Sequence, residues 1–342
     1  MIIIRQYRIL FLVFILVFGT VITFYLIETR SSIGIKMINF NQSIMQQISN
    51  NEMRNHFHIS SNVHIVDLTV PIQRRLPCTQ TKTLLRNLTT TICLHQSKKD
   101  RYISGAFQNS TAIWEEDQVI RILELLIRHP HLHFIDLGAN IGTYTMFVAT
   151  LGRFVLAVDC FQPNIVRLTR AIQLSNLSTH VVLVQNALFS RSGQSLRLSV
   201  DTTNIGGQGI LLSGNSSPQY RSPSNLSTKT PYIVETITMD ELLPILVARG
   251  IRGALIKMDI EGSESFVVES GGRVFDTLDI PFVQMEWKIV RRYIDRATVV
   301  RNFFRRRNYD PTTTDCQLLN SDESNLWPDE IFWLRRNISN FC

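Results

Sequence analysis

The sequence predicts an α/β protein with a doubly wound parallel sheet, and three observations carry this prediction. First, short apolar runs are separated by segments of helix length, at residues 133–138, 153–159, 180–186, 254–262 and 281–287. Strands that alternate with helices are typical of parallel pairing. Second, the runs FVLAV and VVLV are continuously apolar, as expected of strands covered on both faces. Third, a turn with glycines follows the first run, where such sheets bind ligands.

Composition agrees with a globular protein. The chain has 342 residues, of which 44% are hydrophobic and 18% charged, and this excludes collagen, wholesale disorder and a coiled coil. The length has room for one large domain or two modest ones. The formal charge is +7, but 28 acidic residues are spread among 35 basic ones. A nucleic-acid partner is therefore not expected.

The first elements of the chain predict a membrane anchor. Residues 9–27 carry no charge and, at about 1.5 Å per helical residue, are long enough to cross a bilayer. A cleaved signal peptide has a shorter apolar region and a small-residue cleavage site, so we expect a retained transmembrane signal anchor. Arg5 and Arg8 precede the run, which places residues 1–8 in the cytosol and the rest in a lumen. The prediction is a single-pass type II membrane protein of the endoplasmic reticulum or Golgi.

Residues 28–110 are rich in Ser, Thr, Asn and Gln without a sustained period, which predicts a stem and a lead-in segment before a domain at 111–342. Glycosylation sequons follow the anchor, at Asn41, Asn87, Asn109, Asn176, Asn215, Asn225 and Asn337. The cysteines lack metal-ligand spacing, so no metal site is expected. The sequence-local disulfide candidates are Cys78 with Cys93 and Cys316 with Cys342, which leaves Cys160 as a buried thiol.

Helix signals fill the gaps between the predicted strands. From Asp117 the apolar residues fall on one helical face. Pro163 stands where a first-turn proline opens a helix, and Thr238 with Glu241 forms a capping box before another helix. Residues 201–231, rich in Gly, Ser, Asn and Pro, predict a long loop of the kind that covers a binding cleft.

The turn after the first strand carries the main candidate site, with Asp136, Gly138, Asn140 and Gly142 in one strand–turn–helix segment. Gly138 lets the chain turn tightly, and Gly142 lets the next helix start close to the sheet. The carboxylate of Asp136 is placed to meet a cationic ligand, and the following amides point into the crevice. The segment matches neither the G-x-G-x-x-G pattern nor a P-loop.

These residues resemble the first motif of the FkbM family of S-adenosylmethionine-dependent methyltransferases. Further segments resemble that family in the same order, at residues 160–164, 185–188, 204–207, 236–240 and 257–264 and at Glu286. The resemblance covers residues 115–290. It implies a Rossmann-like class I methyltransferase fold and S-adenosyl-L-methionine as the cofactor.

The resemblance also implies which residues bind the cofactor, namely Asp136, Gly138, Asn140, Gly142, Gln162, Asn186 and Ala187. Asp136 and Asn140 would hold the methionine end, Gln162 the ribose, and Asn186 with Ala187 the adenine edge. Gln162 stands where the family has an acid, so a charge-assisted hydrogen bond, about twice as strong as a neutral one, would be lost. Asp159 is an alternative acid.

The catalytic candidates follow the fourth predicted strand. Asp259 is the preferred residue beside the transferred methyl group, with Lys257, Glu261 and Glu286 behind it. Clustered carboxylates raise one another's pKa and can leave one of them poised as a base. Glu264 is expected only to place negative charge in the first turn of a helix.

The sequence therefore predicts an O-methyltransferase whose acceptor is a sugar hydroxyl of a glycan or glycolipid, or a small molecule. The alternative is a non-catalytic, membrane-anchored module for protein binding or secretory trafficking. Gln162 favours this alternative, as does the lumen, into which a cofactor made in the cytosol would have to be imported. The sequence does not predict an oligomeric state.

Overall fold

The structure is a computed structural model that describes residues 58–107, 112–213, 217–218, 230–336 and 341. The predicted anchor at 9–27 lies outside these residues. Among the residues described, no helix is long and apolar enough to span a bilayer. The predicted pairing of Cys316 with Cys342 also lies outside, because Cys342 is not described.

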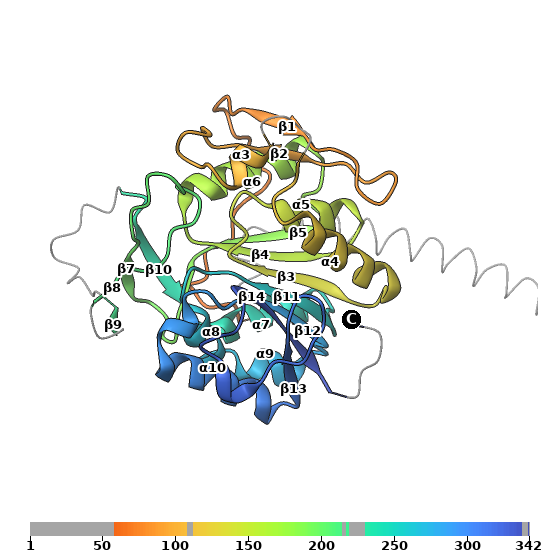
Figure 1. Cartoon of the computed structure of the whole chain (residues 1–342). Coiled ribbons are helices and arrows are strands. Elements are labelled where there is room, and N and C mark those ends of the chain that lie inside the picture. Colours follow the sequence, from red (N-terminus) through yellow and green to blue (C-terminus); the bar gives the residue numbers. More distant parts are fainter. Residues whose placement is uncertain (1–57, 108–111, 214–216, 219–229, 337–340, 342) are drawn as a thin grey trace, which may run out of the picture. The chain divides into compact units, whose positions relative to one another are not determined.

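A seven-stranded sheet forms the centre, in the order β13-β14-β12-β11-β3-β4-β5 (Figure 1). Its strands are β3 His133–Leu137, β4 Val155–Asp159, β5 Val181–Gln185, β11 Ala254–Met258, β12 Phe282–Glu286, β13 Tyr309–Thr312 and β14 Glu330–Arg335. The five strands from β5 to β12 are parallel, which confirms the predicted strands and the Rossmann-like α/β class. The strand order reverses between β3 and β11, and ligands bind at such a switch point.

The strands β13 and β14 were not predicted. β14 pairs antiparallel with β12 and with β13, so it lies between them and β13 forms the edge of the sheet. Apolar runs separated by helix-length segments do not indicate β13 or β14, because β13 follows its helix directly and contains Pro311. Proline is tolerated there because β13 is an edge strand.

Helices cover both faces of the sheet (Figure 1). One face carries α4 Glu116–Arg128, α5 Thr143–Thr150 and α6 Gln162–Leu174, and the other carries α7 Leu243–Ala248, α8 Glu264–Glu269, α9 Gly272–Thr277 and α10 Ile294–Arg306. The 3-10 turns are η3 Met239–Leu242, η4 Val290–Arg292 and η5 Ser321–Glu323. The capping box of Thr238 and Glu241 is present at η3, as predicted.

The core under α4, α5 and α6 is apolar and closely packed. Leu126 of α4 and Phe147 of α5 are fully buried against Phe134 of β3. Burying a Leu or Phe side chain stabilises a fold by about 1.5–3 kcal/mol. This core fixes the helices against the sheet and so fixes the turn between β3 and α5.

The chain before α4 packs on the same compact unit, which spans Met53–Cys342. A hairpin of β1 Cys78–Gln80 and β2 Thr91–Cys93, followed by α3 Ile103–Ala106, lies next to α6 (Figure 1). The predicted disulfide between Cys78 and Cys93 is confirmed. Ile65 forms a bridge with Val184 of β5. Residues 58–107 therefore pack in one unit with the domain that the sequence predicts at 111–342.

A small side sheet stands at the carboxyl edge of the central sheet, with β6 Ala187–Leu188, β10 Ile233–Ile237 and β7 Ser195–Arg197 in that order. A second core, which includes Phe161, Phe189 and Leu196, fills the space beside it. The short strands β8 Leu212–Ser213 and β9 Ser217–Pro218 follow in the predicted long loop. The described start of this loop, residues 199–211, reaches the edge where the candidate site lies.

Candidate functional site

A cavity of about 610 Å³ opens where β3, β4, β11 and β12 end. Its lining includes most of the residues predicted for the site, namely Asp136, Gly138, Asn140, Asn186, Ala187, Lys257, Asp259, Glu261 and Glu286. Two of the predicted residues, Gly142 and Gln162, do not line it. The cavity thus joins side chains from four strand ends that are far apart in the sequence.

The glycine-bearing turn is shaped by backbone crowding. Gly138 has a φ of +84°, and a Cβ atom there would overlap the carbonyl oxygen of Asp259. Asn140 follows with a φ of +51°. Gly142, with a φ of +96°, begins α5, and a Cβ atom there would overlap the side chain of Leu168 on α6. Gly142 therefore serves the packing of α5 against α6, and it does not line the cavity with the other residues predicted for the cofactor.

Asp136 lies at the base of the cavity and is only 1% exposed. Its Oδ2 accepts hydrogen bonds from the backbone amide and the hydroxyl of Thr145, at 3.2 and 2.6 Å. Its Oδ1 is buried and has no hydrogen-bond partner among the described residues. Burial raises the pKa of Asp136, although the nearby Lys257 ammonium opposes this shift. One carboxylate oxygen is thus left for a donor that the described residues do not supply.

Asp159, at the end of β4, is the carboxylate of the cavity that contacts the turn after β3. It accepts hydrogen bonds from the backbone amides of Asn140 and Phe161, both at 2.8 Å, and so ties the first turn to the start of α6. Burial raises its pKa to about 7, although these hydrogen bonds oppose the shift. Of the two candidates weighed from the sequence, Asp159 lines the cavity.

Gln162 is outside the cavity lining, so the structure does not bring it together with the other residues predicted for the cofactor. Its side chain is exposed and lies with Arg74, Pro163 and Arg167 around a smaller hollow on the outer side of α6. The physical reason is that α6 begins at Gln162 and Phe161 turns inward instead. The replacement of an acid at position 162 therefore removes no charge from the cavity.

Asn186 holds the wall of the cavity through its side chain. Its Oδ1 accepts from the backbone amide of His64 at 2.7 Å. Its Nδ2 donates to the carbonyl oxygens of Asn62 and Glu235, at 3.0 and 3.2 Å. The amide group is thus engaged on both sides, and Asn186 and Ala187 both line the cavity.

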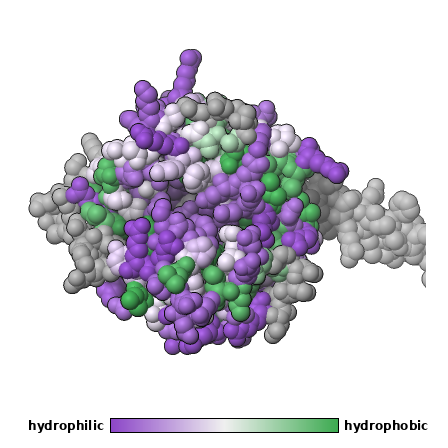
Figure 2. Space-filling view, viewed as in Figure 1, coloured by the Kyte–Doolittle hydropathy of each residue, from purple (hydrophilic) through white to green (hydrophobic). Residues whose placement is uncertain are grey.

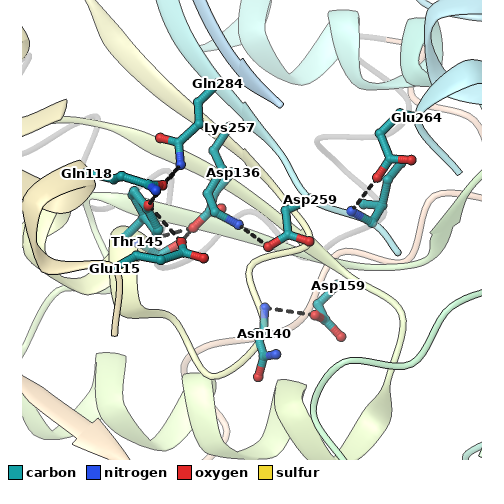
Figure 3. Close-up of polar contacts among 12 residues, drawn as sticks. Glu115, Gln118, Asp136, Asn140, Thr145, Asp159, Lys257, Asp259, Glu264 and Gln284 are labelled. Atoms are coloured by element: carbon teal, nitrogen blue, oxygen red, sulfur yellow. Dashed lines mark hydrogen bonds and ion pairs between the residues drawn. The ribbon is translucent and has the colours of Figure 1, made fainter. Parts of the chain in front are cut away.

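Lys257 and Asp259 form an ion pair at the centre of the site, with 2.9 Å between Nζ and Oδ2 (Figure 3). Lys257 is 5% exposed, and its ammonium lies 5.1 Å from the ring centre of Tyr144. Burial alone would lower the pKa of Lys257, but attraction by Asp259 and Glu115 raises it above its ordinary value. Lys257 is therefore a fixed positive charge and not a base.

Carboxylates with raised pKa values surround this ion pair. Burial and the charge of Asp259 raise the pKa of Glu261 to about 7 and that of Glu286 to about 10. Glu264 is fully buried behind the loop and accepts from the amide of Ile260 at 3.1 Å (Figure 3). It does not line the cavity, so it supports the loop, close to what the sequence predicted.

Three carboxylates of the cavity were not found from the sequence, namely Glu115, Asp201 and Glu330. Glu115 comes directly before α4 and accepts from the hydroxyl of Tyr144 at 2.8 Å. Glu330 begins β14 opposite Glu286 of β12. No motif marks Glu115 or Glu330. Glu330 could have been found only by recognising β14 as a neighbour of β12.

Glycines of the long loop close one side of the cavity. A Cβ atom on Gly206 would lie 2.6 Å from Oδ1 of Asn140, and one on Gly207 would overlap the carboxylate of Glu261. Asn164 of α6 donates from Nδ2 to the carbonyl oxygen of Gly206 at 2.9 Å and so holds this loop in place. The expectation that the described part of this loop reaches the cleft is confirmed.

The lining is acidic although the chain is basic. It contains eight carboxylates against two lysines and no arginine among the described residues. The face shown in Figure 2 is largely hydrophilic, with hydrophobic residues in small separate groups. The described part of the chain has no group of three or more His, Cys, Asp or Glu arranged to hold a metal ion. The carboxylates of the lining are suited to cationic and hydrogen-bond-donating groups.

The fold and the site define an α/β protein with an acidic ligand cavity at the switch point of its sheet. The sequence profile described as the methyltransferase FkbM domain matches residues 136–311, which is more than half of the chain. The chain belongs to the FkbM methyltransferase domain family, so the predicted family is confirmed and the domain is that of a methyltransferase.

No curated protein matches the chain. Among solved structures it is similar to precorrin-6y C5,15-methyltransferase from Geobacter metallireducens GS-15, at 9% sequence identity and a TM-score of 0.30. The similarity covers 65% of this chain and 86% of that one.

Proposed function

We propose that this protein is an S-adenosylmethionine-dependent O-methyltransferase that acts on a sugar hydroxyl of a glycan or glycolipid. The observation that carries the proposal is the acidic cavity at the ends of β3, β4 and β11, within a domain of the FkbM methyltransferase family. A sugar hydroxyl fits the polar lining, and exposed Tyr102 stands at the cavity beside Trp114, with 5.9 Å between the ring centres. Aromatic faces of this kind can pack against a sugar ring.

The residues present fit the cofactor. S-adenosylmethionine is a cation. Its ammonium group and its ribose hydroxyls need hydrogen-bond acceptors. Asp136 offers the unpartnered Oδ1 to the methionine end, next to Asn140. Asp159, in place of Gln162, would accept from the ribose, and the backbone at Asn186 and Ala187 would border the adenine. Charge-assisted hydrogen bonds of this kind are about twice as strong as neutral ones.

When bound, S-adenosylmethionine supplies a methyl group that its sulfonium already activates. The chain must then position an acceptor hydroxyl and take its proton. Lys257 holds the carboxylate of Asp259 at the cavity wall, with 2.9 Å between Nζ and Oδ2. Asp259 would therefore orient the acceptor without moving itself. Glu261 is the better base, because a pKa of about 7 matches the pH at which it must accept a proton. Glu286 lies beside it as a second carboxyl.

The test is calorimetric titration of the purified chain with S-adenosylmethionine. We expect binding that is lost in Asp136→Asn. Absence of heat up to millimolar cofactor would contradict the proposal and favour the non-catalytic module. Transfer of a labelled methyl group into a glycan extract, abolished by Asp259→Ala, would identify the reaction.

We further propose that residues 9–27 anchor the protein as a single-pass type II membrane protein with its domain in the lumen of the endoplasmic reticulum or Golgi. The basic residues before this run support this orientation. Two sequon asparagines that the structure describes, Asn87 and Asn176, are exposed. We expect endoglycosidase to increase the gel mobility of the protein from cells. A lumenal domain would be contradicted if endoglycosidase leaves the mobility unchanged and if Asn87→Gln and Asn176→Gln also migrate like the natural chain.

A further inference from the structure

The carboxylates that fit the cofactor are only some of those that line the cavity. Besides Asp136 and Asp159, which fit S-adenosylmethionine, the lining contains the carboxylates of Glu115, Glu261, Glu286 and Glu330. Lys257 is already paired with Asp259, which leaves Lys288 as the other positive charge of the described lining. An anionic acceptor would thus meet several carboxylates and little positive charge.

Glu286 and Glu330 come together through the pairing of β12 with β14. They are direct partners in this antiparallel register, and both line the cavity. Directly opposite residues of an antiparallel pair have Cβ atoms about 5 Å apart, and like charges there are destabilising. Oε2 of Glu286 is buried without a hydrogen-bond partner among the described residues. Oδ1 of Asp136, on a side chain that is 99% buried, shares this condition in the same cavity.

Two facing, half-buried carboxylates, one with a buried oxygen that lacks a partner among the described residues, need either protons or an external cation. We propose, on the basis of the proposed methyl transfer, that the acceptor carries a protonated amino group that binds between Glu286 and Glu330. The acceptor class is then an amino alcohol, such as a sugar with a free amine beside the hydroxyl that receives the methyl group. An ammonium group has three donors and can satisfy Oε2 of Glu286 and the carboxylate of Glu330 together.

The groups around Glu286 support this assignment. Burial raises its pKa to about 10, and the carboxylates of Asp259, Glu264, Glu261 and Glu330 act in the same direction. Glu330 likewise has its pKa raised, by burial and by Asp259 and Glu115, while Lys257 opposes the shift. The raised pKa favours the protonated form of Glu286 in the free protein. An arriving ammonium lowers the pKa of both carboxyls, so amine binding releases protons to the solvent and strengthens as pH rises, until the amine itself loses its proton.

The experiment compares glucosamine, glucose and glucuronic acid by calorimetry on the full-length chain in detergent, with saturating S-adenosylmethionine. The pH is chosen so that glucosamine is protonated. We expect glucosamine to bind about tenfold or more tightly than glucose, since a hydrogen bond to a charged group contributes about 1.5–3 kcal/mol. Glucuronic acid is expected to bind most weakly. Titrations in two buffers of different ionisation enthalpy are expected to show proton release with glucosamine and none with glucose.

The variant Glu330→Gln removes one charge and keeps the side-chain shape. We expect it to abolish the preference for glucosamine and to reduce the proton release, while Glu323→Gln on the exposed turn η5 leaves both unchanged. Should Glu330→Gln fail to fold, Glu286→Gln provides the same comparison. Equal affinity for glucosamine and glucose, or tightest binding of glucuronic acid, would overturn the amine assignment. Failure of the cofactor itself to bind is seen in a separate titration and would overturn the proposed methyl transfer instead.

Discussion

The carbonyl oxygen of Asp259 lies directly against the Cα atom of Gly138, across the switch point of the sheet. A Cβ atom at position 138 would overlap this oxygen, and the amide of Asp259 donates to the carbonyl of Leu137 at 3.0 Å. The turn that fits the cofactor and the loop that carries the candidate catalytic carboxylates are therefore held together by backbone contact. Any shift of one loop moves the other.

Gly138→Ala is expected to destabilise the protein and to abolish cofactor binding. The left-handed φ of +84° costs an alanine about 1–2 kcal/mol, and the overlap with Asp259 adds about 1–3 kcal/mol. The matched control is Gly152→Ala, where φ is +83° and no atom lies within 4 Å of a new Cβ. Denaturant unfolding compares the two. Equal losses of stability would show that crowding between the loops is unimportant.

Asp159→Asn is expected to weaken S-adenosylmethionine binding about tenfold or more, because a charge-assisted hydrogen bond becomes neutral. The backbone amides of Asn140 and Phe161 also lose their charged acceptor. By contrast, Gln162→Glu is expected to leave affinity nearly unchanged, since Gln162 lies outside the cavity. Calorimetric dissociation constants decide between the two positions. Tighter binding in Gln162→Glu would instead place the ribose contact at position 162.

The methyl-transfer rate is expected to rise with pH through about 7. Burial and Asp259 raise the pKa of Glu261 to about 7, so this carboxyl is protonated and inactive below that pH and becomes a base above it. The profile of kcat/KM against pH measures the effect. Glu261→Gln is expected to lower kcat and to remove this limb of the profile. If the limb persists at the same pH in Glu261→Gln, another group is the base.

Removal of the disulfide between Cys78 and Cys93 is expected to cost about 3 kcal/mol of unfolding free energy, because a loop of 15 residues is no longer closed in the unfolded chain. The double variant Cys78→Ala, Cys93→Ala tests this by denaturant unfolding. Reductant is expected to lower the midpoint of the natural chain by more than that of the variant, in which only the predicted pair of Cys316 and Cys342 is left to reduce. Cys160→Ala, which keeps the disulfide, is the control. An unaffected natural chain in reductant would contradict a stabilising role.

The five parallel strands and the capping box at η3 could be predicted because their signals are local. Each signal lies within a short stretch of sequence: a continuous apolar run, a helix-length spacing, or the pair Thr238 and Glu241. The motif order also located the candidate site at four strand ends. Residues 58–107 were assigned to a stem, because a short disulfide-linked hairpin and a single bridge at Ile65 leave no periodic pattern in a sequence.

The amino-acid sequence by itself determined the α/β class, the family and the strand ends at which Asp136, Asp259 and Glu286 stand. Only the tertiary structure decided that Asp159 and not Gln162 faces the cavity, because the turn between β4 and α6 sets the direction of each side chain. It also brought Glu330 opposite Glu286. Pairing between strands that are distant in the chain depends on the whole sheet, so no local pattern of residues contains it.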